Sequence, residues 1–176
     1  YPSSLRIVNW IKWSLLGSDI KQDWHDSLAV QVRYLSQNLE YHILGNHLFS
    51  NAKALIYAGL YFQGIEAEKW YKTGITIFNK ELQEQVLSDG GNFELSPMYH
   101  AIFLEDLLDI FNIQQAFNKQ FQYDITNKIT SMFDWLRAMC HPDGEVSFFN
   151  DSVIGIAPNL TELEKYAERL KIPLSK

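Results

Sequence analysis

The chain has 176 residues, of which 47% are hydrophobic and 14% aromatic, and this composition suits a globular domain with a substantial apolar core. A formal net charge of −6 and the lack of a basic stripe argue against nucleic acid as a partner. No apolar run approaches the roughly twenty residues that a membrane-spanning helix needs, and the single cysteine, Cys140, excludes an internal disulfide.

The first half of the chain carries helical periodicity. Apolar residues recur at three- and four-residue spacing, and glycines interrupt the pattern. The pattern predicts helices over residues 3–16, 19–44, 46–62 and 65–87, separated by Gly17, Gly45 and Gly64.

In the second half, Ser88-Asp89-Gly90-Gly91-Asn92 is a strong turn signal. Ser96 is expected to cap the next helix, with Pro97 at its first position, where a missing N–H costs nothing. The pattern predicts helices from Pro97 to about residue 113, over 123–140, and from Asn159 or Thr161 to 170, with a short extended stretch at 146–149. Because no set of strands could form a sheet, we expect a single all-α domain over residues 1–176.

Polar junctions near residues 45, 95 and 148 recur at intervals of about fifty residues, a weak repeat that fits stacked helical hairpins. Short loops favour antiparallel neighbours, so the helices that start at 46 and 96 should open on the same rim. The loop at 141–152 should lie there too. The sequence therefore predicts one functional face built from three loops.

Three residues on this face are candidates for catalysis. Asn46 is either an N-cap or part of an anion site at a helix N-terminus. His47 follows it directly. Tyr99 occupies the third helical position after Ser96, where a capping box would have Glu or Gln, so either core packing or a functional phenol explains it.

Four further residues are candidates for substrate binding. His100 orients Tyr99, contacts substrate or only packs, and the sequence does not separate these roles. Glu94 precedes the capped helix, and its alternative is a solvated loop carboxylate. Asn150 and Asp151 close the third polar junction, where a turn or an N-cap is the alternative.

The remaining charged residues indicate no further site. Glu105, Asp106 and Asp109 are predicted to form a solvated acidic face. No His, Cys, Asp or Glu set has the spacing of a metal site, and no glycine loop suits a phosphate, so we expect neither metal nor cofactor.

Three segments of the sequence resemble bacterial heparinase II/III-type polysaccharide lyases. They are Asn46-His47-Leu48 through Leu55, Asp89-Gly90-Gly91-Asn92 through Leu108, and Pro142-Asp143-Gly144-Glu145 through Ser152. The run from Gly90 to His100 is the most specific of them, and the resemblance covers roughly residues 40 to 170.

The resemblance implies a partial (α/α) toroid of antiparallel helical hairpins, normally followed by a β-sandwich domain that this chain lacks. It further implies that Asn46 or His47 neutralises a uronate carboxylate and that Tyr99 acts as base, acid or both. The partner would be an acidic polysaccharide, and a periplasmic or cell-envelope location would follow. The chain starts at Tyr1 without a methionine or a leader, so we expect a piece of a longer protein that is inactive by itself.

The expected reaction is β-elimination on a uronic-acid-containing polysaccharide. One alternative is a toroid-type glycoside hydrolase that uses Glu94 and Asp151 as its two carboxylates. Another is a non-catalytic carbohydrate-binding or assembly module. Exposed apolar flanks of a partial toroid would also favour a homo-oligomer.

Overall fold

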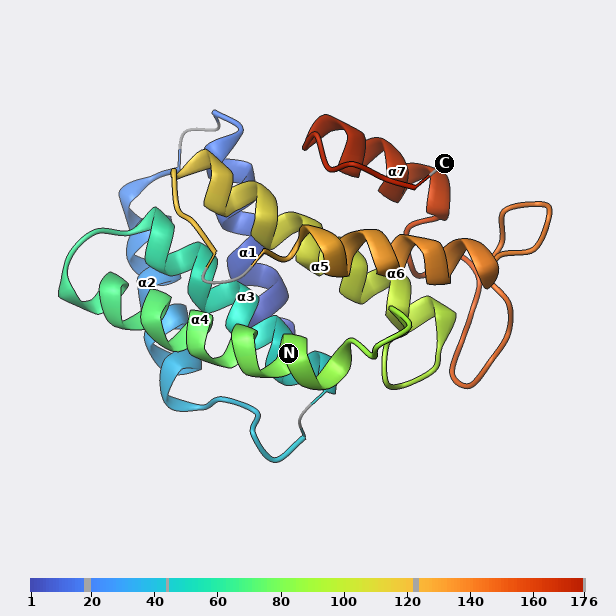
Figure 1. Cartoon of the computed structure of the whole chain (residues 1–176). Helices are drawn as coiled ribbons and strands as arrows, with labels where there is room; N and C mark the ends of the chain where they lie inside the picture. Colours follow the sequence, from blue (N-terminus) through green and yellow to red (C-terminus); the bar gives the residue numbers. More distant parts are fainter. Residues whose placement is uncertain (18–19, 44, 122–123, 176) are drawn as a thin grey trace. The chain divides into compact units, whose positions relative to one another are not determined.

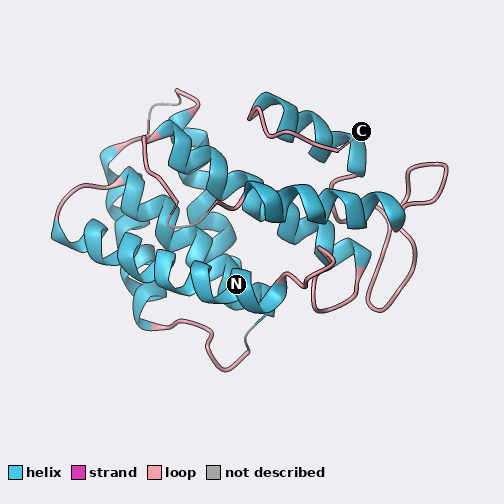
Figure 2. Cartoon of the chain, viewed as in Figure 1, coloured by secondary structure: helices cyan, strands magenta, loops and turns pink. Residues whose placement is uncertain are grey.

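The structure is a computed structural model that describes residues 1–17, 20–43, 45–121 and 124–175 (Figure 1). Within these ranges it contains seven α-helices and no β-strand, which confirms the all-α prediction (Figure 2). The helices are α1 (Pro2–Leu15), α2 (Gln22–Gln37), α3 (Gly45–Tyr61), α4 (Ile65–Gln85), α5 (Pro97–Ala116), α6 (Thr126–Ala138) and α7 (Leu160–Arg169). None of these described helices is long and apolar enough to cross a bilayer.

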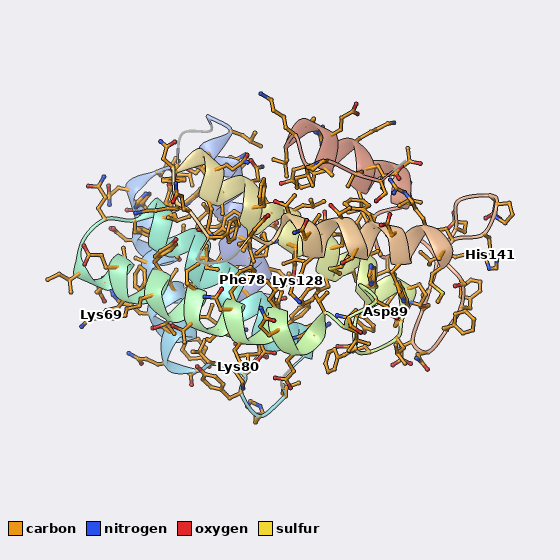
Figure 3. The ribbon with its side chains drawn as sticks, in the orientation of Figure 1. Lys69, Phe78, Lys80, Asp89, Lys128 and His141 are labelled. Atoms are coloured by element: carbon orange, nitrogen blue, oxygen red, sulfur yellow. The ribbon has the colours of Figure 1, made fainter. Side chains whose placement is uncertain are left out.

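The chain divides into two compact units, unit 1 (Tyr1–Glu81) and unit 2 (Leu82–Lys176). In unit 1, α3 is the central helix, because nearly its whole surface is buried against α1, α2 and α4. Phe49 of α3 packs against Phe78 of α4, with ring centroids 5.8 Å apart. Both rings are fully buried, and Phe78 is labelled in Figure 3.

Two glycines let α3 and α4 approach each other closely. A Cβ on Gly59 would lie 2.5 Å from the backbone nitrogen of Tyr71, and one on Gly74 would lie 2.9 Å from the carbonyl oxygen of Ala52. The end of α3 thus meets the start of α4, and the middle of α3 meets a later part of α4. The two helices are therefore antiparallel, as the hairpin prediction requires.

Helix α2 is shorter than its apolar pattern suggests. The predicted ends, residues 19 and 44, lie outside the described residues, but α2 already stops at Gln37. The Asn38 side chain donates to the Tyr34 carbonyl at 2.8 Å, and the Glu40 N–H donates to Asn51 Oδ1 of α3 at 2.9 Å. The second bond takes the backbone of residue 40 away from the helical pattern, so the prediction of a helix as far as residue 44 was wrong.

In unit 2, α5 is the central helix and packs against α6 and α7. The cap prediction is confirmed, because Ser96 Oγ accepts the Tyr99 N–H at 3.3 Å and Pro97 is the first helical residue. Helix α7 starts after Asn159, whose side chain forms a reciprocal capping box with Glu162. The expected start of α6 at residue 123 lies outside the described residues, and α6 runs from Thr126 to Ala138.

Two expectations for unit 2 were wrong. Asp106 and Asp109 do not form a solvated face, since they are only 9% and 2% exposed. The Tyr166 hydroxyl of α7 donates to Asp109 Oδ1 at 2.9 Å, so this carboxylate links two helices. The stretch at 146–149 forms no strand, only an isolated bridge between Cys140 and Val146.

Candidate functional site

The loop at residues 147–152 is hydrogen-bonded to the chain just before α5. Asn150 Nδ2 donates to the carbonyl oxygens of Glu94 at 3.2 Å and Leu95 at 3.0 Å. Two of the three predicted polar junctions, those near residues 95 and 148, therefore meet within unit 2. The third, at Asn46, belongs to unit 1.

A pair of serines joins the same two segments. Ser152 Oγ lies 3.0 Å from Ser96 Oγ and accepts the Met98 N–H at 3.3 Å, while it donates to the Phe149 carbonyl at 2.9 Å. Both serines are buried. The first turn of α5 thus has two of its otherwise unpaired N–H groups satisfied by side-chain oxygens, one from each serine.

The backbone is strained where these segments meet. Leu95 has φ of +53° and Asn150 has φ of +50°, both in the left-handed region. Asn adopts that region readily, whereas a bulky side chain such as Leu rarely does. Strain of this kind persists only where surrounding contacts hold it, and here the Asn150 amide holds the Leu95 carbonyl.

The Gly90-Gly91 turn lies against α6. A Cβ on Gly90 would overlap the Ser131 carbonyl oxygen, and one on Gly91 would lie 2.7 Å from Trp135 Nε1. Asp89 Oδ1 accepts the Gly91 N–H at 3.0 Å and shapes the turn. These glycines therefore form the predicted turn and also allow the loop to contact α6.

His100 of α5 holds this loop through a hydrogen bond to the loop backbone. Its ring is fully buried and stacks on Trp135, with centroids 4.5 Å apart. Nδ1 accepts the Asn92 N–H at 3.2 Å, and Nε2 lies 2.9 Å from the Met132 carbonyl, to which it donates. Burial lowers the pKa of the ring to about 4, although the bond to Met132 and the charge of Asp89 act in the opposite direction. Both ring nitrogens are engaged, so the arrangement favours the packing role among the three left open, and direct contact with substrate stays a prediction.

Tyr99 differs from its buried neighbour. It is partly exposed in the first turn of α5, and its hydroxyl makes no hydrogen bond with any residue in the described ranges. Glu94 is also partly exposed, and Asn150 and Asp151 are exposed. A phenol held on a capped helix end, beside an acidic and amide-bearing loop, is available to a ligand.

In unit 1, His47 belongs to a second polar cluster near the start of α3. Its Nδ1 lies 3.2 Å from Glu40 Oε1, and its ring packs against Tyr1 with centroids 4.8 Å apart. Glu40 Oε2 accepts from Asn51 Nδ2 at 2.7 Å, and Asn51 Nδ2 also donates to Ser4 Oγ at 3.0 Å. Asn51 is fully buried, so the cluster is anchored in the core.

The Glu40 carboxyl is held in its ionised form. Its burial raises the pKa, but hydrogen bonds from the amino group of Tyr1, from Asn51 and from His47 outweigh burial and lower the pKa to about 2. A carboxylate is therefore present beside His47 at neutral and mildly acidic pH.

Asn46 lies in the first turn of α3, which starts one residue earlier at Gly45. Its side chain is partly exposed and makes no hydrogen bond with the described part of the chain. The sequence analysis missed Glu40 and Asn51. A signal for Asn51 was present, because this amide interrupts the apolar surface of α3 between Leu48 and Leu55.

Solved structures show which class of protein shares this arrangement. The chain aligns with the crystal structure of heparinase III at a TM-score of 0.77 and 25% identity, over 95% of this chain and 28% of that one. It also aligns with the heparan sulfate lyase HepC from Pedobacter heparinus at a TM-score of 0.66 and 26% identity, over 85% of this chain and 24% of that one. The predicted (α/α) toroid portion is confirmed by these matches.

Sequence comparison identifies the family. The Heparinase II/III N-terminus family matches residues 18–171, so the chain belongs to this family. It is 36% identical over 115 residues to a heparin-sulfate lyase of Bacteroides stercoris, a match that covers 64% of this chain and 17% of that protein. With the heparin-sulfate lyase of Pedobacter heparinus it shares 32% identity over 132 residues, covering 73% of this chain and 20% of the relative. The chain thus spans about a fifth of the length of these relatives.

Proposed function

We propose that this chain is the helical part of a larger polysaccharide lyase that cleaves a uronic-acid-containing polysaccharide by β-elimination. The observation that carries the proposal is the capped start of α5, where Tyr99 presents a phenol without an internal hydrogen-bond partner among the described residues. Similarity to heparin-sulfate lyases supports the substrate class. Because the relatives are much longer, further residues of the site would come from outside this chain, and the chain by itself would be inactive.

The reaction needs a group that stabilises negative charge and a group that moves a proton. The C5 proton of a uronate is weakly acidic while the adjacent carboxylate is fully charged. Asn46 and His47, with the N–H groups of the α3 first turn, would bind this carboxylate and stabilise the enolate-like charge that develops on it. Tyr99 would exchange a proton with C5 or with the glycosidic oxygen. The C5–H and C4–O bonds break, a C4–C5 double bond forms, and the departing oxygen gains a proton.

Replacing one hydroxyl tests the role of Tyr99. In the full-length protein, we expect Tyr99→Phe to lower kcat by about 10²- to 10⁴-fold, the usual contribution of a general acid or base, while substrate binding changes little. The ultraviolet absorbance of the conjugated unsaturated uronate measures the product directly. Tyr34→Phe is the matched control, since Tyr34 is 63% exposed on α2 and has no proposed role.

Each outcome of this experiment distinguishes the alternatives. Undiminished turnover in Tyr99→Phe would exclude the proposed proton transfer. Cleavage without a double bond would indicate hydrolysis and point to Glu94 and Asp151 instead. Binding of acidic glycans by a full-length protein that never cleaves them would favour a carbohydrate-binding module.

A further inference from the structure

The His47 ring has one nitrogen engaged and the other available. Nδ1 faces Glu40 Oε1 at 3.2 Å, whereas Nε2 makes no hydrogen bond within the described ranges. The side chain is 35% exposed, so a ligand can reach it. Because a carboxylate only accepts hydrogen bonds, Nδ1 has to be the donor in this pair.

The geometry of the neighbouring residues fixes this pairing. The Glu40 N–H donates to Asn51 Oδ1, and Asn51 Nδ2 donates back to Glu40 Oε2, so the backbone and side chain of Glu40 are both held by one buried amide. Asn51 lies four residues after His47 on α3, and residues at this spacing share a helix face. The Tyr1 ring packs against the imidazole and limits its rotation.

We propose that Glu40 is a positioning residue that keeps the proton of His47 on Nδ1 and leaves Nε2 to meet the substrate. This inference rests on the proposed function, in which His47 helps to bind a uronate carboxylate. An unprotonated Nε2 only accepts hydrogen bonds, so the ring binds a uronate carboxylate once Nε2 takes up a second proton. Nε2–H then donates to that carboxylate, and Glu40 balances the positive charge from the other side. The carboxylate–histidine pair thus prepares the ring for an anionic sugar.

Substituting Glu40 by Gln should reverse the tautomer without changing the size of the side chain. In Glu40→Gln the new amide oxygen still accepts from Asn51, which turns its NH2 group toward His47 Nδ1. Nδ1 then has to accept, and the proton of the neutral ring moves to Nε2. The Nδ1–H preference should therefore be lost.

The imidazole ¹⁵N resonances of the 176-residue chain report this tautomer at about pH 8, where ordinary histidines are neutral. A His47→Gln spectrum assigns the resonances. His100 is an internal reference with the opposite tautomer, because its Nε2 donates to Met132 and its Nδ1 accepts from Asn92. Glu66→Gln is the matched control, since Glu66 forms an exposed pair with Arg33 in the same unit.

We expect Nδ1–H at His47 in the unchanged chain and in Glu66→Gln, Nε2–H in Glu40→Gln, and an unaltered His100 in all three. An unprotonated His47 Nδ1 in the unchanged chain would overturn the inference. So would an Nδ1–H tautomer of His47 that persists in Glu40→Gln. An altered His100 in Glu40→Gln would assign the change to general disruption and overturn it as well.

Activity of the full-length protein separates this inference from the proposed function. Glu40→Gln should lower kcat/KM by about 10- to 100-fold, because the neutral amide no longer balances the charge of the doubly protonated ring, while Glu66→Gln should not. If the tautomer reverses but elimination is as fast as before, the positioning role is wrong while the lyase proposal stands. If the unchanged protein forms no unsaturated product, the proposed function fails, and with it the role of Nε2 toward a uronate.

Discussion

At the scale of single residues, His100 makes the stability of unit 2 depend on pH. Its pKa is lowered from 6.5 to about 4 in the folded state, mainly because burial disfavours the charged ring. Between these values the unfolded chain binds more protons than the folded one, so acid favours unfolding. The stabilisation is complete above pH 6.5 and is lost as the pH falls toward 4. The shift corresponds to about 3 kcal/mol.

Denaturant unfolding at several pH values measures this effect. We expect the free energy of unfolding to fall by up to about 3 kcal/mol between pH 6.5 and 4 in the unchanged chain, and much less in His100→Gln. His141→Gln is the control, because His141 lies exposed in a turn after α6 (Figure 3). Glu40, whose pKa is lowered from 4.5 to about 2 in the folded state, also weakens the fold in acid, but only below about pH 5, so the slope between pH 6.5 and 5 reports His100. Equal slopes for His100→Gln and the unchanged chain would show that another group is responsible.

The adjacent residues Tyr99 and His100 also show what sequence can tell about a site. Successive helical residues point about 100° apart, so one of them faces the core and the other the surface. The sequence placed both in the first turn of α5, and the Ser96 cap confirms that. It could not tell which of the two is buried, because that depends on where Met132 and Trp135 of α6 lie.

At the scale of secondary-structure elements, the contact between the Gly90 turn and α6 allows two energetic costs of adding a side chain to be measured separately. These are the strain of a left-handed backbone and the steric overlap with α6. Gly90 and Gly144 have nearly the same positive φ, +89° and +90°. A Cβ on Gly144 would meet nothing within 4 Å, whereas one on Gly90 would overlap Ser131. We expect Gly144→Ala to cost about 1 to 2 kcal/mol for the left-handed backbone alone. Gly90→Ala should cost about 2 to 5 kcal/mol, since steric overlap is added.

Thermal and denaturant unfolding of the two alanine variants measure the difference. Because both positions have nearly the same positive φ, most of the backbone penalty is common to the two variants, and the difference in unfolding free energy reports mainly the cost of pushing the loop away from α6. If both variants were equally stable, the loop would not be packed against α6 as tightly as the structure shows.

Local signals predicted some helix ends and missed others. Ser96 with Pro97, and Asn159 with Glu162, are capping signals that act within a few residues, so the starts of α5 and α7 could be predicted. The end of α2 could not be, because Glu40 leaves the helical pattern to bind Asn51 of another helix. The Glu40–His47 pair could not be predicted either, because it forms only when the segment around Glu40 packs against α3.

At the scale of the whole molecule, the proposed reaction requires Asn46 of unit 1 and Tyr99 of unit 2 to reach one sugar ring. We expect the double variant Asn46→Cys/Tyr99→Cys to form an internal crosslink with a reagent about as long as a monosaccharide. Cys140 is the only natural cysteine, so Cys140→Ser provides a clean background. Mass spectrometry of peptide fragments identifies the crosslinked pair.

The control pairs Asn46→Cys with Lys69→Cys. Lys69 lies near the start of α4, beyond the far end of α3, and fifteen residues of α-helix separate positions 46 and 61 by about 22 Å. This pair should resist the same reagent. A crosslink to Lys69→Cys but not to Tyr99→Cys would contradict the proposed common site.

The stack between Trp135 and His100 gives unit 2 an optical signal of its own. Of the five tryptophans in the sequence, Trp135 alone falls in unit 2. The others, in unit 1, are Trp10, Trp13, Trp24 and Trp70. Exchanging those four for phenylalanine would leave one fluorophore whose emission follows the melting of unit 2, while circular dichroism follows all helices together. Coincident midpoints would mean that the two units melt as one cooperative block, and separate midpoints would mean that each melts alone.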